Sequence, residues 1–343
     1  MSIFGKRTKK VVITTVTLVI GYFLLIAYLV TQDEPVFTSN TNQELSEKAL
    51  DDLGFEQVYT SRQHFFTMRN NSKLAAQHFA HNSNLTIIVL HGILSSSYTN
   101  NRFSGLIKEA ANAEVYSLDL RGHGYSDGKP GDVDYIGQYV DDVADVVRKI
   151  KQDKPNGKII IAGHSMGGGI SLRYAMNKNT PDVDGYLMFA PQLGENSPTN
   201  KVTDSQLNEP ENSFMAIHLP RLIGLALLNS MGINKWNELP VFFFNLPEGM
   251  PVRSYSFRSS ASMSPRDYAT GLQAIDKPLL VVVGENDEAF NAAAYQDAIS
   301  TYTEGNFLMV DGQTHNGIRH DDIAMSRVRD WINTNDEFLS EGE

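Results

Sequence analysis

A serine flanked by glycines is the part of the sequence best suited to chemistry. Residues 163–169 read GHSMGGG, so Gly163 and Gly167 lie two positions on either side of Ser165. Each glycine lowers helix stability by about 1 kcal/mol relative to alanine. A run of glycines at this position therefore indicates a structural or functional requirement for glycine. The pattern G-x-S-x-G is typical of a sharp turn between a strand and a helix, which presents the serine hydroxyl above the edge of a sheet.

The segments around this turn have the composition that it requires. KIIIA before it predicts a buried strand, and ISLRYAMNK after it predicts a helix. Side chains at 163 and 167 would collide with neighbouring elements, and Gly168 and Gly169 would let the helix start lie close to adjacent strands. The helix start would direct free N–H groups and a positive dipole end at a developing anion. We therefore interpret Ser165 as a nucleophile rather than as part of a glycine-rich loop.

A serine hydroxyl is a weak nucleophile and needs a general base. In a fold with this turn, the expected chain order is serine, then an acid, then histidine. Of the nine histidines, only His315 and His320 follow the late predicted strands. His315 directly follows NFLMVDGQT and is the preferred base. The alternative, His320, approaches the last helix and would otherwise be a surface residue.

The acid is expected after the preceding strand, where LLVVVGENDE offers Glu285, Asp287 and Glu288. Asp287 is preferred because a loop at the strand end can reach His315 from there, and Glu285 is next. The alternative is a simple acidic turn. The acid would hold the imidazole tautomer and stabilise the imidazolium without itself accepting the proton.

Two backbone N–H groups are needed to stabilise the oxyanion. Met166, directly after the nucleophile, is predicted to supply one. The loop after the early strand reads LHGI and is predicted to supply the other from Ile93. His164 is expected to pack or brace the turn rather than act as the base, because a sequence neighbour would point away from Ser165.

Strands and helices alternate along the chain in a way that would position these residues. Near-continuous apolar runs of this length suit strands buried on both faces of a parallel sheet, and the alternation predicts an α/β fold with helices on both faces. The predicted strands lie in 85–92, 113–124, 158–165, 185–191, 277–287 and 306–315, and the predicted helices in 44–53, 135–152 and 321–334.

The segment 192–270, called the insertion below, interrupts this alternation. It shows no convincing buried strand, and its apolar pieces are cut by prolines. Phe242–Phe244 and the run 222–228 could line an acyl pocket, or they could pack the insertion onto the body.

The N-terminus has the pattern of a signal anchor. Residues 1–10 contain four cations and no acid, and residues 11–30 contain 20 residues without a charge. That length spans a hydrocarbon layer of about 30 Å. The positive-inside rule predicts a cytoplasmic N-terminus, with residues 31–343 on the extracytoplasmic side, which is the periplasm in a bacterium with two membranes. A cleaved signal peptide and a buried core helix are the alternatives.

Composition narrows the possible partners. The chain has 343 residues, no cysteine and a net charge of −11, and this acidity argues against nucleic-acid binding. Disulfides and cysteine-based metal sites are excluded. No metal cluster, cofactor or obligate protein partner is evident.

Taken together, LHGI, DLRGHGYSDG, GHSMGGG, VVGENDE and GQTHN resemble the α/β-hydrolase superfamily in order and spacing. GHSMGG with DLRGHGYSDGKPG is most similar to its monoacylglycerol lipase and lysophospholipase group, also called serine aminopeptidase-like hydrolases. The resemblance implies a hydrolase domain over 58–335 after a tether at 31–57, a cap over the site at 192–270, the triad Ser165, Asp287 and His315, and an oxyanion hole at Ile93 and Met166.

The expected reaction is hydrolysis of a carboxylic ester by acyl transfer to Ser165 and then to water. The anchor and the apolar insertion favour a small apolar or lipid-derived ester as substrate. A peptidase or amidase with the same triad is the alternative, and a binding protein without catalytic activity is the third hypothesis. Arg121, His123 and Asp127 are interpreted as a structural loop beside the site.

Overall fold

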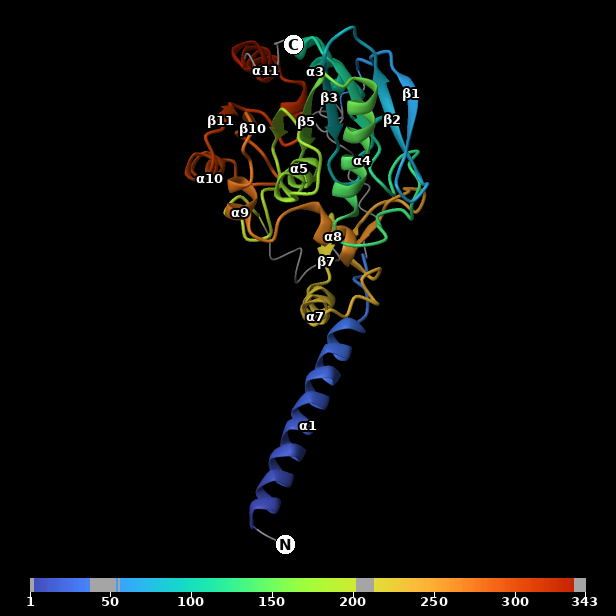
Figure 1. Cartoon of the computed structure of the whole chain (residues 1–343), viewed down its shortest axis with the longest axis vertical. Coiled ribbons are helices and arrows are strands. Elements are labelled where there is room, and N and C mark those ends of the chain that lie inside the picture. Colours follow the sequence, from blue (N-terminus) through green and yellow to red (C-terminus); the bar gives the residue numbers. More distant parts are fainter. Residues whose placement is uncertain (1–2, 38–53, 55, 202–212, 336–343) are drawn as a thin grey trace.

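The computed structural model describes residues 3–37, 54, 56–201 and 213–335 (Figure 1). In these residues, eight strands form a central sheet. Their spatial order is β1-β2-β4-β3-β5-β6-β10-β11. β1 and β2 pair antiparallel, as do β2 and β4, and the other neighbours pair parallel. The strands are β1 (Arg62–Thr67), β2 (Lys73–Phe79), β3 (Leu85–Leu90), β4 (Glu114–Leu118), β5 (Lys158–His164), β6 (Gly185–Phe189), β10 (Leu279–Gly284) and β11 (Asn306–Val310).

The six parallel strands are the six that the apolar runs predict, and the α/β fold with a mostly parallel sheet is confirmed. β3 and β10 are buried along their whole length, which explains their unbroken apolar sequence. The sequence reading assigned no strand to the β1–β2 hairpin. β1 lies at the sheet edge, and most of its residues are exposed or half-buried, so its apolar signal is weak.

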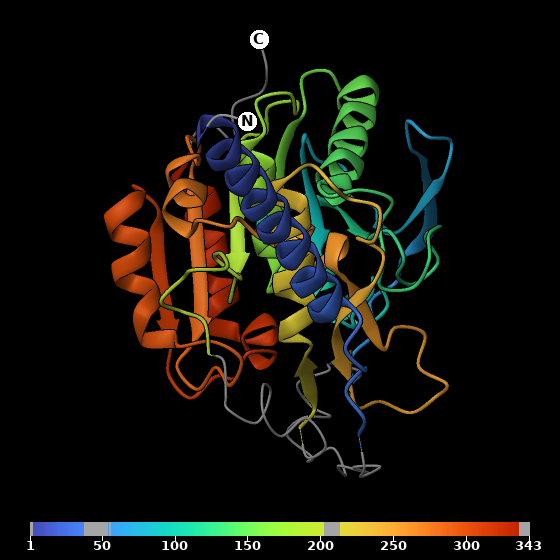
Figure 2. The ribbon, with the colours of Figure 1, turned by 90° about the horizontal axis from the view of Figure 1, so that it is seen from below.

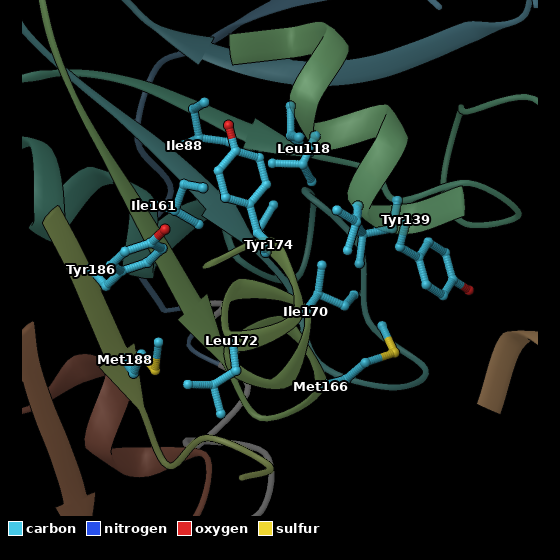
Figure 3. Close-up of a cluster of buried hydrophobic side chains, with 14 of the residues drawn as sticks. Ile88, Leu118, Tyr139, Ile161, Met166, Ile170, Leu172, Tyr174, Tyr186 and Met188 are labelled. Carbon is cyan, nitrogen blue, oxygen red and sulfur yellow. The ribbon is translucent and has the colours of Figure 1, made fainter. Parts of the chain in front are cut away.

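Helices cover both faces of the sheet, as the alternating pattern predicts. On one face, residues of α3 and α11 share a buried cluster with Ile87 and Val89 of β3. On the other face, residues of α4, α5 and α10 share a cluster with Ile88 and Leu90, and Figure 3 shows Ile88 in this cluster. Each such aliphatic side chain contributes about 1.5–3 kcal/mol by leaving water. The helices are α3 (Asn101–Ala111), α4 (Gln138–Asp153), α5 (Met166–Met176), α10 (Tyr295–Tyr302) and α11 (Asp322–Thr334), with 3₁₀ turns at η2 (Ala292–Ala294) and η3 (Gly317–His320).

The insertion does contain strands, contrary to the sequence reading. β7, β8 and β9 form a separate three-stranded antiparallel sheet, in which Val241, Phe244 and Tyr255 are buried. These strands have only three to five residues, too few to show a clear period. The elements here are β7 (Met215–Ile217), α7 (Leu219–Ser230), β8 (Pro240–Phe244), β9 (Ser254–Ser256), α8 (Phe257–Met263) and α9 (Tyr268–Gln273).

The N-terminal helix α1 (Ile3–Val30) projects away from the body and touches it only near its C-terminal end (Figure 1). Its segment Lys9–Val30 is long and apolar enough to cross a membrane. Most of its apolar side chains are exposed, whereas Ile26 and Val30 are buried. The helix is therefore not a core helix of the domain. The predicted helix at 44–53 lies outside the described residues.

Candidate active site

Ser165 lies at the turn between β5 and α5, in the place that the sequence predicts. Its φ of 53° and ψ of −117° are outside the regions that non-glycine residues usually occupy, and such backbone strain concentrates at functional sites. A side chain at Gly163 would overlap the backbone of Gly167, and one at Gly167 would overlap the carbonyl of Leu90. The two flanking glycines are thus sterically required.

Gly168 and Gly169 are also tightly enclosed, but not by the strands that the sequence reading expected. A Cβ atom on Gly168 would overlap Pro191, which follows β6. One on Gly169 would overlap the carbonyl of Met263 in α8 and approach that of Gln192 to 2.8 Å. The start of α5 therefore packs against the insertion as well as against the sheet.

His315 and Asp287 come together from the loops after β11 and β10. Their Nδ1 and Oδ2 atoms are 2.8 Å apart, and both residues are buried. The other carboxylate oxygen of Asp287 accepts hydrogen bonds from the amides of Ala289 and Phe290 at 2.8 and 2.7 Å. Because the carboxylate accepts from Nδ1–H, the Nε2 atom of His315 keeps its lone pair and can take a proton.

The alternative residues lie elsewhere. Glu285 accepts a hydrogen bond from the amide of Gly312, and Glu288 accepts one from the backbone amide of His315 at 3.0 Å. The ring of His320 lies against Gly54, and within the described part of the chain neither of its nitrogens has a partner. Burial lowers the pKa of His320 to about 3, so this residue stays neutral.

His164 joins the serine turn to the histidine loop. Its Nε2–H donates to the carbonyl of His315 at 3.0 Å, and the two ring centroids are 4.7 Å apart. Burial, with Arg319 and His315 as further causes, lowers the pKa of His164 well below its usual value. His164 thus braces the site as a neutral residue, as the sequence reading expected. In the described structure no hydrogen bond links Ser165 Oγ to His315; such bonds are often loose before substrate binds.

The predicted oxyanion loop lies against the serine. A Cβ atom on Gly92 would be 3.2 Å from the Cβ of Ser165. His91 Nδ1–H donates to the Gly92 carbonyl at 2.7 Å, and because a trans peptide directs its N–H opposite to its C=O, this bond fixes the direction of the Ile93 amide. Within the described residues, the amides of Ile93 and Met166 donate to no protein acceptor, so both are available to a ligand oxygen.

The comparisons with known proteins agree with this fold and geometry. The family model described as "Serine aminopeptidase, S33" matches residues 81–235. The solved structure of Est1E from Butyrivibrio proteoclasticus with ferulic acid superposes with a TM-score of 0.57 at 18% identity, over 81% of this chain and 100% of that one. The chain is an α/β hydrolase. Its sequence is similar to those of serine aminopeptidases and monoglyceride lipases.

Curated relatives of this α/β hydrolase are matched over parts of their length. The monoglyceride lipase of Saccharomyces cerevisiae is 27% identical over 59% of this chain and 67% of that enzyme. The monoacylglycerol lipase of Mycolicibacterium smegmatis is 43% identical over 19% of this chain, and the match spans only 23% of that enzyme. The crystal structure of a membrane phospholipase A superposes with a TM-score of 0.56 at 16% identity, over 96% of this chain and 99% of that one.

Tyr255 of β9, which the sequence analysis did not single out, contacts the predicted oxyanion loop. Its hydroxyl oxygen accepts a hydrogen bond from the amide of Leu94 at 2.7 Å, and it lies 2.9 Å from Nε2 of His123. His123 Nδ1–H donates to the carbonyl of Arg121, so Nε2 accepts the proton of the tyrosine hydroxyl. Leu94 has a φ of 58°, and Tyr255 thus fastens a strained residue directly after Ile93.

The remaining residues of the RGHGYSD segment are structural, as predicted. Arg121 forms a buried ion pair with Asp142 at 2.7 Å. Asp127 accepts a hydrogen bond from the amide of Lys73 at 2.8 Å. These bonds fix the loop on which His123 stands. The contact between His123 and Tyr255 links residues 132 positions apart, and no local sequence pattern marks such a pair.

Proposed function

We propose that this α/β hydrolase is a membrane-anchored serine hydrolase that cleaves carboxylic esters through an acyl-enzyme on Ser165. The observation that supports it best is the buried hydrogen bond between His315 and Asp287 beside the strained turn that presents Ser165. A serine nucleophile, a histidine base and an acid that orients the histidine form the arrangement that serine hydrolases use on several unrelated folds.

In the first half of the reaction, Ser165 Oγ attacks the ester carbonyl carbon and its proton passes to Nε2 of His315. Asp287 stabilises the imidazolium through the Nδ1 bond. The carbonyl oxygen becomes an oxyanion and accepts hydrogen bonds from the amides of Ile93 and Met166. The tetrahedral intermediate then collapses, the bond to the alcohol oxygen breaks, and His315 returns the proton to the departing alcohol.

In the second half, water attacks the acyl-enzyme and His315 takes a proton from it. The second tetrahedral intermediate collapses and releases the carboxylic acid, while the proton returns to Ser165 Oγ. No cofactor is needed, because the reaction transfers only an acyl group and protons.

A lipid-derived ester is the proposed substrate class. The names of the relatives support it, since they include monoglyceride lipases and a membrane phospholipase A. We propose that the insertion acts as a cap over the site. Phe243 and Phe244 are buried, and Phe244 contacts Tyr255 at a ring-centroid distance of 5.8 Å. This favours a packing role for these two residues over one in lining an acyl pocket.

The proposed location is the membrane, with the N-terminus cytoplasmic and the hydrolase domain extracytoplasmic. The length and hydropathy of Lys9–Val30 support a span. Retention of α1 is further supported by the burial of Ile26 and Val30, because cleavage would expose the surface that covers them. Carbonate washing should leave the full-length protein in the membrane fraction. A mature N-terminus beyond residue 25 would instead show a cleaved signal peptide.

Labelling with a fluorophosphonate tests the nucleophile, because such probes react covalently with activated serines. The wild-type chain should be labelled and Ser165→Ala should not. Ser300→Ala, an exposed serine on α10, is the matched control and should label normally. Labelling that survives Ser165→Ala would refute the assignment. Loss of turnover in His315→Ala would exclude a binding protein without catalysis.

A peptidase or amidase is the second candidate, and the family description "Serine aminopeptidase" favours it. The same triad can cleave an amide, provided that His315 protonates the amine as it leaves. Turnover of a panel of p-nitrophenyl acyl esters and aminoacyl p-nitroanilides distinguishes an esterase from a peptidase or amidase. Faster turnover of the anilides would favour the peptidase.

A further inference from the structure

Helix α7 has the composition of a buried helix but lies at the surface of the insertion. Its sequence LPRLIGLALLNS contains one charged residue, Arg221, and that residue is buried. Leu219 and Ile223, four positions apart and therefore on one face, are 41% and 42% exposed. A helix that is apolar on all sides normally lies in a protein core or in a membrane, so water is an unsuitable neighbour for this face.

The opposite side of α7 packs against the end of α1. Leu225 and Leu228 of α7 are buried with Ile26 and Val30 of α1 in one cluster. Gly224 permits this approach, because a Cβ atom there would come 2.7 Å from a side-chain carbon of Val30. The end of α1 is thus packed into the insertion.

Arg221 fastens the same junction. Its guanidinium donates to the carbonyls of Val30 and Gln32 at 3.1 and 3.2 Å and lies 3.1 Å from the carboxylate of Glu34. His218 Nε2 also donates to the carbonyl of Gln32, at 3.1 Å. These bonds satisfy carbonyl groups at the end of α1 that would otherwise lack partners.

The position of this junction along α1 determines how close α7 comes to the bilayer. The charge-free run of α1 covers residues 11–30, about 30 Å of helix, which equals the thickness of the hydrocarbon layer. Ile26 and Val30 are the last two contact points in that run and lie about 6 Å apart along the axis. If α1 spans the bilayer, α7 must therefore lie at its surface, within about one helical turn of the acyl chains.

The orientation of α7 fits this position. Figure 1 shows α7 end-on beside the end of α1, and Figure 2 shows α1 slanting across the body in the view from below, so the two axes cross rather than run parallel. If α1 spans the bilayer, α7 is therefore inclined away from the membrane normal, toward the plane in which interfacial helices lie. The loop after it carries Trp236, which is 42% exposed, with the ammonium of Lys235 5.6 Å from the centre of its ring. Tryptophan is enriched at the headgroup level of membranes.

We propose that Leu219, Ile223 and Trp236 form a docking surface that inserts into the boundary between acyl chains and headgroups of the bilayer that α1 spans. This inference rests on the proposed membrane anchoring and adds a second, separate contact with lipid. The partner is the lipid surface itself and the contact is apolar, because the chain is too acidic to be drawn to anionic lipids by charge.

Fluorescence quenching by brominated lipid tests the docking surface directly. The chain contains two tryptophans, Trp236 and the buried Trp331. Full-length protein is reconstituted in phosphatidylcholine vesicles with bromine at shallow or deep acyl positions, in a Ser165→Ala background that prevents lipid hydrolysis. Trp331→Phe, which leaves Trp236 as the only tryptophan, should be quenched, and more strongly by shallow bromine. Trp236→Phe, which leaves only Trp331, should show no quenching.

A matched pair of variants tests the role of α7. In the Trp331→Phe chain, Ile223→Asp should reduce the quenching of Trp236 by at least about half, because a charged side chain withdraws this face from the acyl boundary. Ile323→Asp makes the same change at a 62% exposed position on α11 and should leave quenching unchanged. Equal effects of the two variants would overturn the proposal.

A third probe separates failure of the docking surface from failure of the anchor. Tyr22→Trp places a tryptophan inside the span, in a chain where Trp236 and Trp331 are both phenylalanine. If this probe is quenched by deep bromine and Trp236 is not quenched at all, the anchor stands and the docking surface is wrong. If neither is quenched, the anchoring is wrong and the docking surface falls with it.

Discussion

The two halves of the candidate site are positioned in different ways. Ser165 directly follows β5, and Asp287 and His315 lie in the loops after β10 and β11, two strands that pair side by side. The loop that carries Ile93 is instead fastened by side chains, among them Tyr255 from the insertion, 161 positions away. The insertion contacts both halves, because the Gln192 amide donates to the Ser165 carbonyl at 3.0 Å and Lys201 Nζ donates to the Asp287 carbonyl at 2.7 Å. In the oxyanion half, it contacts the residue directly after the predicted donor Ile93.

This difference has a consequence for catalysis. A variant that damages the triad half should remove chemistry and leave the insertion intact. A change in the position of the insertion should alter the oxyanion loop, because Tyr255 connects the two. We expect the insertion to tune the turnover rate without contributing a reacting atom.

The largest effect is expected in the triad half, for Asp287→Asn. Asparagine can donate to Nδ1 and so favours the wrong imidazole tautomer, and the comparable change in a serine protease costs about 10⁴-fold in kcat. We expect a loss of similar size in ester turnover, measured under saturating substrate. Glu285→Gln is the matched control, since Glu285 contacts Gly312 and not the imidazole. An equal loss in both variants would show that the loop, not the hydrogen bond, was damaged.

In the oxyanion half, Tyr255→Phe should lower kcat by about 10- to 100-fold. Removing one oxyanion donor lowers kcat by about 10²–10³-fold. In this variant the Ile93 amide is still present but is held less firmly, so the loss should be smaller. KM should change little, because the substrate carbonyl forms weaker hydrogen bonds with the Ile93 and Met166 amides in the ground state than the oxyanion does in the transition state. Stability should also fall by about 1–3 kcal/mol, since the Leu94 amide and His123 lose a buried partner.

The control for this variant is Tyr139→Phe. Tyr139 is also fully buried, and its hydroxyl bonds to Ser259 of the insertion at 2.9 Å, away from the oxyanion loop. It should lose comparable stability in urea unfolding and keep its kcat. If both tyrosine variants lower kcat to the same extent, Tyr255 has no special link to Ile93.

Local sequence patterns mark the parts of the triad half, but they do not reveal the Tyr255 contact of the oxyanion half, for a physical reason. The strands and the glycines at 163 and 167 are marked by local patterns, because each depends on its immediate chain neighbours. Asp287 and His315 each follow such a strand. Tyr255 belongs to a three-residue strand and acts on residues that are distant in sequence. Only the folded chain brings it to Leu94.

Gly169→Leu tests how firmly the insertion and the triad half are joined. The added side chain would meet the carbonyls of Met263 and Gln192, and such overpacking costs about 1–3 kcal/mol. Urea unfolding should show this loss. Gly249→Leu is the control, because nothing lies within 4 Å of a Cβ atom there. An unchanged midpoint in Gly169→Leu would show that the insertion moves away without cost.

The smallest expected effect concerns pH and again the oxyanion half. Burial lowers the pKa of His91 to about 4 and that of His123 to about 3, whereas both should titrate near 6.5 in the unfolded chain. Their contribution to stability is complete above pH 6.5 and falls as the pH drops toward the folded values, because the unfolded state then binds more protons. Each contributes a slope of about 1.4 kcal/mol per pH unit in that window. His123→Gln should remove one such slope between pH 6 and 4.5 in urea unfolding. An unchanged slope would show that His123 is not held neutral beneath the loop.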